Sequence, residues 1–288
     1  MAEATQAMRD TICLVTGATS GVGLVTAQAL AQQGATVLVV ARNPERGAAT
    51  VKRMAQDTGN PNIDLLLADL SSQAQIRQLA AAVQRRCTRL DVLVNNAGAL
   101  FTRRRLSADG LEMTLALNHL GYFLLTNLLL DRLKASASAR IVNVASNAHR
   151  GGRINFADLQ GQRRYGGWRA YCQSKLANLL FTYELARRLG NTGVTANAVH
   201  PGFVATGFGR NNPGAFAWLI RIAQCAALSP EQGATTLIYL ASSPEVQGVT
   251  GTYFVKKRAV PSSKASYDQA AARRLWDISA DLTSLTDG

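Results

Sequence analysis

Cysteine and histidine are scarce in this chain of 288 residues, and their spacing fits no common metal site. The four cysteines form no CxxC pair and lie far apart, at Cys13, Cys87, Cys172 and Cys225. The three histidines, His119, His149 and His200, complete no ligand spacing typical of zinc. We therefore expect reduced thiols and no bound metal.

Long apolar runs are also missing. The chain has no run of 18 apolar residues, and its first ten residues, MAEATQAMRD, do not resemble a signal peptide. A signal peptide would have a charged start, an apolar centre and a small-residue cleavage site. These absences favour a cytoplasmic protein with no transmembrane segment.

Acidic residues are few, with 18 Asp and Glu against 31 Lys and Arg, so the formal charge is +13. Clustered basic residues can neutralise nucleic-acid phosphates. Here the charges are mostly dispersed, with small clusters at 103–105, 163–164 and 256–258 and no nucleic-acid-binding motif around them. We therefore expect no nucleic-acid partner, and an anionic cofactor on a basic surface explains the balance more simply.

What the chain does contain is an alternation of strand and helix patterns. Short apolar runs predict strands at 12–15, 36–41, 63–67, 92–95, 140–144, 194–199 and 252–255. Helical patterns lie between them, including 111–133, 169–189 and 230–241. This rhythm predicts an α/β fold of the Rossmann type, with a doubly wound, seven-stranded, mainly parallel sheet and helices on both faces. We expect a single domain over residues 1–288, with a core of about 11–255 and a C-terminal extension of about 256–288.

A glycine-rich turn follows the first predicted strand. Gly17, Gly21 and Gly23 have the spacing GxxxGxG rather than the commoner GxGxxG, and tight packing alone could explain them. Their place between a strand and a helix favours binding of a dinucleotide pyrophosphate at the helix N-terminus.

The end of the second predicted strand bears on the choice of cofactor. NAD enzymes usually carry an acidic residue there, whereas this chain has Ala41 and then Arg42. A guanidinium group pairs well with a 2′-phosphate, and Arg46 lies one helical turn further on. The sequence thus favours NADP(H) over NAD, with a solvated arginine as the alternative.

Tyr171 and Lys175 lie four residues apart on the predicted helix 169–189, so they share a face. A nearby ammonium group stabilises the phenolate, lowers the pKa of the tyrosine and makes it a usable proton donor and acceptor. Ser146 ends the fifth predicted strand, where a hydroxyl could polarise a substrate carbonyl. Asn118 lies inside a predicted helix, although asparagine is a poor helix former. Each has an ordinary structural explanation, but all four are predicted to lie near one sheet edge.

Together, TGATSGVG, NNAG, Asn118, Ser146, Tyr171-x-x-x-Lys175 and Pro201-Gly202 resemble the classical short-chain dehydrogenase/reductase family. Segments 117–126, 171–189 and 194–206 are similar to its retinol-dehydrogenase-like branch, and the resemblance extends from about residue 11 to 285. It implies a catalytic tetrad. In this tetrad Tyr171 is the general acid/base and Lys175 lowers its pKa and binds the nicotinamide ribose. Ser146 holds the substrate oxygen, and Asn118 anchors a water in a proton relay.

The glycine turn, the strand-end arginine and the resemblance together define an expected dinucleotide site. Its residues are Gly17, Thr19, Ser20, Gly21, Val22, Gly23, Arg42, Arg46, Asp69, Leu70, Asn95, Ala97, Gly98, Tyr171, Lys175, Pro201, Gly202, Val204 and Thr206. The chain departs from the family pattern in two ways. Ser146 precedes Tyr171 by 25 positions, a longer gap than in most classical members. The N-terminal apolar segment of membrane-anchored members is also missing.

Two further segments bear on the substrate. The loop 203–228 is rich in apolar residues, which favours a hydrophobic substrate if the loop covers the site, with core packing equally favoured. Arg103, Arg104 and Arg105 could meet an acidic substrate group, although a solvated charge run is the favoured interpretation.

We therefore expect an NADPH-dependent oxidoreductase that interconverts a lipophilic aldehyde or ketone and an alcohol by hydride transfer, with Tyr171 as proton donor and acceptor. One alternative is a non-catalytic NADP-binding regulatory or scaffold protein, and another is a C=C reductase on the same fold. Helices 111–133 and 171–189 could also pair in a homo-oligomer, although burial within one chain would explain them equally well.

Overall fold

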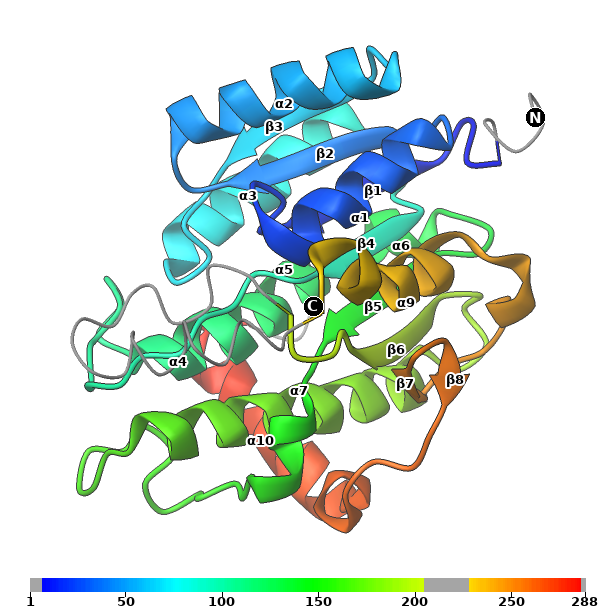
Figure 1. Cartoon of the computed structure of the whole chain (residues 1–288). Helices are drawn as coiled ribbons and strands as arrows, with labels where there is room; N and C mark the ends of the chain where they lie inside the picture. The colour runs from blue at the N-terminus through cyan, green and yellow to red at the C-terminus, as the bar shows by residue number, and fades with distance from the viewer. Residues whose placement is uncertain (1–6, 205–227, 286–288) are drawn as a thin grey trace.

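The computed structural model describes residues 7–204 and 228–285, and a single sheet forms its centre (Figure 1). In the described residues the sheet has the strand order β3-β2-β1-β4-β5-β6-β7-β8. The parallel strands are β1 (Ile12–Thr16), β2 (Thr36–Ala41), β3 (Ile63–Leu67), β4 (Val92–Asn95), β5 (Arg140–Val144), β6 (Thr195–His200) and β7 (Tyr253–Val255). The order reverses between β1 and β4, where ligands bind in open α/β sheets.

The predicted doubly wound parallel fold is confirmed, but the described sheet has eight strands where the sequence predicts seven. The eighth strand, β8 (Arg258–Ala259), pairs antiparallel with β7 and comes from the segment predicted as the C-terminal extension. Two residues are too few to give a periodic pattern, so the sequence alone did not reveal it.

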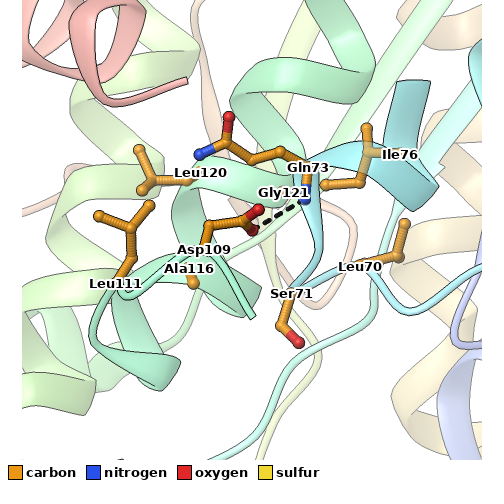
Figure 2. A pocket seen from close by; sticks show the side chains of 9 residues that line it. All are labelled: Leu70, Ser71, Gln73, Ile76, Asp109, Leu111, Ala116, Leu120 and Gly121. Carbon is orange, nitrogen blue, oxygen red and sulfur yellow. Dashed lines mark hydrogen bonds between the residues drawn. The ribbon is translucent and has the colours of Figure 1, made fainter. Parts of the chain in front are cut away.

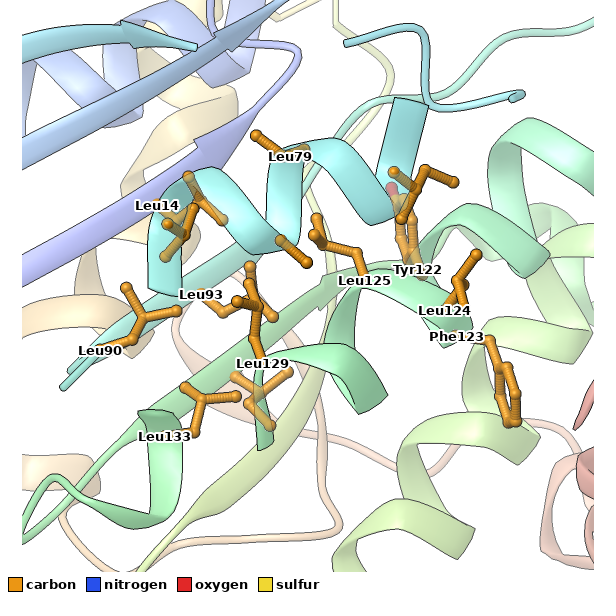
Figure 3. Close-up of a cluster of buried hydrophobic side chains, with 14 of the residues drawn as sticks. Leu14, Leu79, Leu90, Leu93, Tyr122, Phe123, Leu124, Leu125, Leu129 and Leu133 are labelled. Atoms are coloured by element: carbon orange, nitrogen blue, oxygen red, sulfur yellow. The ribbon is translucent and has the colours of Figure 1, made fainter. Parts of the chain in front are cut away.

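Helices cover both faces of the sheet. One face carries α1 (Gly21–Gln32), α2 (Pro44–Thr58) and α9 (Pro230–Ser242). The other carries α3 (Gln73–Arg86), α5 (Gly121–Leu128), α6 (Leu130–Lys134) and α7 (Gly167–Leu189). Side chains alternate between the two faces along each strand, so one strand feeds two cores. In β1, Cys13 and Val15 pack in the first core, under α1, α2 and α9, while Leu14 packs in the second core on the opposite face. Figure 3 shows Leu14 and Leu93 of the strands beside Leu125 and Leu129 in the second core.

The C-terminal extension is built into the fold through α10 (Gln269–Leu282), which packs on the outer side of α7. Trp276 stacks on Phe181, with ring centroids 5.8 Å apart. Leu176, Ala177 and Leu180 of α7 cluster with two apolar residues of α10. This face of α7, which the sequence also allowed for pairing between subunits, is therefore buried within one chain.

The prediction of a single helix over 111–133 is wrong in detail. The structure divides it into α4 (Met113–Leu115), a π-helical turn η2 (Ala116–Leu120), α5 and α6. At the junction Gly121 packs so closely that an added Cβ would lie 2.6 Å from the carbonyl oxygen of Leu70. A π turn inserts one extra residue and re-aims the side chains around it. Asn118 lies at the centre of this turn.

Candidate active site

The glycine-rich turn between β1 and α1 closes tightly on the loop that follows β4. Gly17 has φ = 65°, and a Cβ there would lie 2.9 Å from Cα of Ala97. At Gly23 an added Cβ would lie 2.3 Å from Nδ2 of Asn96 and 2.5 Å from the carbonyl oxygen of Gly17. Only glycine therefore fits this turn, which brings two of the predicted phosphate-binding glycines against the NNAG loop.

Asn96 holds this arrangement in place, and the sequence had singled out its neighbour instead. The Asn96 side chain donates to the carbonyl of Thr16 at 2.8 Å, and its backbone N–H donates to Oγ1 of Thr16 at 2.8 Å. Asn95 points the other way, into the interior, where Nδ2 donates to Thr126 and Asn143 at 2.9 Å each. The side chain of Asn95 is thus not brought to the crevice. The alternation of side chains along a strand could have signalled this difference.

The first turn of α1 has the features of an anion site. Its N-cap residue, Ser20, makes no side-chain hydrogen bond to the helix, and the first turn has no acidic residue. The backbone N–H groups of such a turn, with the positive end of the helix dipole, attract phosphate. The glycine cradle and this helix end therefore fit a dinucleotide pyrophosphate.

Two arginines flank the same turn. The guanidinium group of Arg46 donates to the carbonyl of Thr19 at 3.3 Å, because Asn43 caps α2 and sets its first residues beside the turn. Arg42 lies at the end of β2, with its side chain 74% exposed and NH1 3.8 Å from Oδ2 of Asp69. Asp69 is itself fixed by Ser71, whose N–H and hydroxyl both donate to Oδ1. Both guanidinium groups therefore add positive charge beside the glycine turn.

Tyr171 and Lys175 lie on α7, next to the end of β5. The ammonium nitrogen of Lys175 donates to the carbonyl of Val144 at 3.0 Å and lies 5.7 Å from the centroid of the Tyr171 ring. Ser146, two residues beyond Val144, hydrogen-bonds to the Tyr171 side chain. The hydroxyl, phenol and amine predicted from the sequence are therefore brought together.

Asn118 joins this group through the backbone of the NNAG loop. Its Oδ1 accepts from the N–H of Ala99 at 2.9 Å, while Nδ2 donates to the carbonyl of Ala99 at 2.9 Å and to Oγ of Ser174 at 3.0 Å. A Cβ added to Gly98 would lie 3.1 Å from Oδ1 of Asn118 and 3.6 Å from Nζ of Lys175. Gly98 thus lies between the side chains of Asn118 and Lys175 and allows both to approach the loop closely. Sequence reasoning missed Ser174, which had no signal beyond its place beside Lys175.

The remaining predicted cofactor residues follow β6. Gly202 has φ = 91°, and Val204 forms a parallel bridge with Leu228. A Cβ on Gly233 would lie 2.5 Å from Val204 and 3.0 Å from Val22, so this segment reaches the start of α1. Thr206 and most of the loop 203–228 lie outside the described residues.

A small cavity lies between the β3–α3 connection and the region around η2, whose residues line it (Figure 2). In it the N–H of Gln73 donates to Oδ2 of Asp109 at 2.9 Å. Its volume of about 10 Å³ holds at most one water molecule, so it is too small for a substrate.

Comparison with known proteins agrees with this geometry. The family model described as short chain dehydrogenase matches residues 11–214, which include the glycine turn and the whole tetrad.

The chain is a short-chain dehydrogenase.

Within that family it is retinol-dehydrogenase-like. It is 42% identical to human retinol dehydrogenase 11, with 95% of this chain and 86% of the relative covered, and 38% identical to human polyprenol dehydrogenase, with 96% and 86% covered. A crystal structure from Mycobacterium paratuberculosis has a TM-score of 0.79 and 34% identity, covering 97% and 96%. An active-site complex of Pseudomonas aeruginosa RhlG with NADP has a TM-score of 0.68 and 29% identity, covering 88% and 97%.

Membership of this family makes the chain an oxidoreductase that acts on carbonyl and alcohol groups with a nicotinamide dinucleotide. In the part of the chain described, no helix is long and apolar enough to cross a membrane.

The ionisable groups of this short-chain dehydrogenase differ from the simple expectation. Burial raises the pKa of Tyr171 well above its usual range, although the hydrogen bond from Ser146 acts to lower it. Burial also lowers the pKa of Lys175 to about 7. A lysine that is partly neutral at pH 7 stabilises a phenolate weakly, so the expected lowering of the Tyr171 pKa is not found.

This shifted lysine should make the stability of the cofactor-free protein depend on pH. The pKa of Lys175 is about 7 in the folded protein, against 10.5 for an ordinary lysine such as that of the unfolded chain. Between these values the unfolded chain binds more protons, so the unfolding free energy rises with pH. Relative to Lys175→Met, we expect the wild type to gain about 1–2 kcal/mol between pH 7 and 8.5, measured by urea unfolding. If the difference in unfolding free energy between the wild type and Lys175→Met stayed constant across this pH range, the amine would not be buried and partly neutral.

Proposed function

We propose that this short-chain dehydrogenase is an NADPH-dependent enzyme that interconverts a lipophilic aldehyde or ketone and the corresponding alcohol. The observation that carries the proposal is the meeting of Ser146, Tyr171 and Lys175 beside a glycine turn that fits a dinucleotide. Proton exchange with a carbonyl oxygen requires a positioned acid and a hydrogen-bond donor to that oxygen. The phenol and the hydroxyl of this buried group provide them, next to an amine.

In this mechanism, the bound cofactor supplies a hydride to the carbonyl carbon or accepts one from the alcohol. The phenol of Tyr171 donates a proton to the substrate oxygen, and the hydroxyl of Ser146 donates a hydrogen bond to the same oxygen. Lys175, with a pKa of about 7, can gain or lose a proton near neutral pH as the phenol changes charge. Asn118 fixes Ala99 and Ser174 around the lysine, and we propose that it also anchors the relay water.

The lipophilic substrate rests on two observations. Trp168 is 61% exposed and stacks on the catalytic Tyr171, with ring centroids 5.7 Å apart, and Phe203 beyond β6 is 49% exposed. Large apolar side chains left exposed next to a candidate site favour an apolar ligand. The similarity to retinol and polyprenol dehydrogenases, named for apolar alcohols, supports the same substrate class. We also propose the cytoplasm as the site of action.

Cofactor preference gives a direct test. We expect NADP to raise the melting temperature more than NAD does, because a ligand that binds only the folded state stabilises it. Replacing Arg42 and Arg46 with alanine should weaken NADP binding roughly 10–100-fold and leave NAD binding unchanged, since charge-assisted hydrogen bonds contribute about 1.5–3 kcal/mol. Arg53→Ala, an exposed arginine further along α2, is the matched control. Stabilisation by NAD alone would refute the preference.

A further inference from the structure

The fold brings together two arginine runs that are about 60 residues apart in the sequence. The segment 101–106 carries Arg103, Arg104 and Arg105, and the segment 160–169 carries three more arginines. Nε of Arg104 donates to the carbonyl of Gln160 at 3.0 Å, and the Tyr165 hydroxyl donates to the carbonyl of Phe101 at 2.9 Å. The backbones touch as well, because a Cβ on Gly167 would lie 2.4 Å from the Phe101 oxygen. We call this surface the arginine rim, defined by residues 103–106 and 163–169.

The positive charge of the arginine rim is only partly balanced by neighbouring acids. None of the ion pairs in the described residues includes a rim arginine. Two carboxylates lie nearby: Asp158 accepts from the backbone N–H groups of residues 162–164, and the buried Glu112 accepts from those of residues 114–115 and from the Tyr165 hydroxyl. With six arginines against these two carboxylates, the rim keeps a net positive field.

Large apolar side chains stand among these charges. Leu106 is 50% exposed and Trp168 is 61% exposed, whereas most large apolar residues of the described chain are buried. Trp168 also stacks on Tyr171, so the rim lies directly beside the candidate active site. Arginines around exposed tryptophan and leucine are the combination that binds the interface of an anionic bilayer.

We propose that the arginine rim docks this enzyme onto an anionic lipid bilayer. One carboxylate on a substrate would need one guanidinium group in a bidentate pair, whereas six arginines spread over two segments match an extended anionic surface. The exposed Leu106 side chain can be buried in the apolar layer beneath a lipid surface, whereas a nucleic acid offers no such layer. Docking at this face turns the side of the candidate site that carries Trp168 toward the membrane, so a lipophilic substrate enters without crossing water. Only this last consequence rests on the proposed function.

The test measures binding to vesicles in the absence of cofactor and substrate. Vesicles of phosphatidylcholine with 30% phosphatidylserine are compared with pure phosphatidylcholine by co-sedimentation of the full chain at two salt concentrations. The rim variant carries four arginines changed to glutamine: Arg103→Gln, Arg105→Gln, Arg163→Gln and Arg164→Gln. The matched control removes the same charge from α2 and α3: Lys52→Gln, Arg53→Gln, Arg85→Gln and Arg86→Gln.

We expect the wild type to bind the anionic vesicles, to release them at high salt and to ignore the neutral ones. The rim variant should bind roughly 100-fold more weakly, while the control stays within about threefold of the wild type. Equal losses in both variants would assign binding to net charge and overturn the proposal. Absence of vesicle binding, or binding of duplex DNA in its place, would overturn it as well. Reduction of a short, water-soluble aldehyde tests the proposed function separately, and both variants should retain it.

Discussion

Replacing Tyr171 with phenylalanine should lower kcat for aldehyde reduction by about 10²–10⁴-fold, the usual contribution of a positioned general acid. The change removes only the hydroxyl, and the ring keeps its stacking on Trp168 and its place beside Lys175. NADPH affinity should therefore stay within about threefold of the wild type. Turnover is followed by NADPH absorbance and binding by the shift in melting temperature.

Tyr239→Phe is the matched control for that substitution. Its hydroxyl donates to Glu245 at 3.0 Å on the exposed side of α9, outside the tetrad, so kcat should not change. An unchanged kcat in Tyr171→Phe, with an active wild type, would show that another group transfers the proton. A wild type that binds NADPH but reduces no carbonyl would favour the non-catalytic alternative.

Replacing Gly23 with alanine should have the second large effect. The added methyl carbon would lie 2.3 Å from Nδ2 of Asn96 and 2.5 Å from the carbonyl oxygen of Gly17, so the turn must open. Overpacking of this kind costs about 1–3 kcal/mol of unfolding free energy. Because the same turn is expected to bind the pyrophosphate, NADPH affinity should fall by roughly 100-fold, which corresponds to about 2.7 kcal/mol. Urea unfolding and NADPH titration measure the two effects.

Gly151→Ala serves as the comparison for Gly23→Ala. Its nearest neighbour within 4 Å is Sγ of Cys172 at 3.8 Å, an ordinary contact. We expect its stability to stay within about 0.5 kcal/mol of the wild type, as is usual for surface substitutions, and its NADPH affinity to be unchanged. If Gly23→Ala bound NADPH as tightly as Gly151→Ala, the glycine turn would not be the phosphate site.

The sequence predicted those features that depend on simple periodicity. Apolar runs placed seven strands correctly, and the carboxyl ends of those strands carry Ser146 and the NNAG loop to one edge. The spacing of four between Tyr171 and Lys175 put both side chains on one face of α7, as the structure confirms.

Features set by tertiary packing could not be predicted in this way. The π turn around Asn118 ends at Gly121, which packs against the Leu70 carbonyl, and no local pattern in the sequence records that contact. The opposite orientations of Asn95 and Asn96 depend on where β4 ends, to within one residue. The pKa of Lys175 depends on how completely the fold buries its amine.

The most direct test of the proposed chemistry follows the hydride. The enzyme is incubated with a lipophilic α,β-unsaturated aldehyde and NADPH deuterated at both positions of nicotinamide C4, and the product is examined by mass spectrometry and NMR. We predict an allylic alcohol with one deuterium on the carbinol carbon and the C=C bond intact. A saturated aldehyde with deuterium on the β-carbon would contradict the carbonyl mechanism and assign C=C reduction to this site.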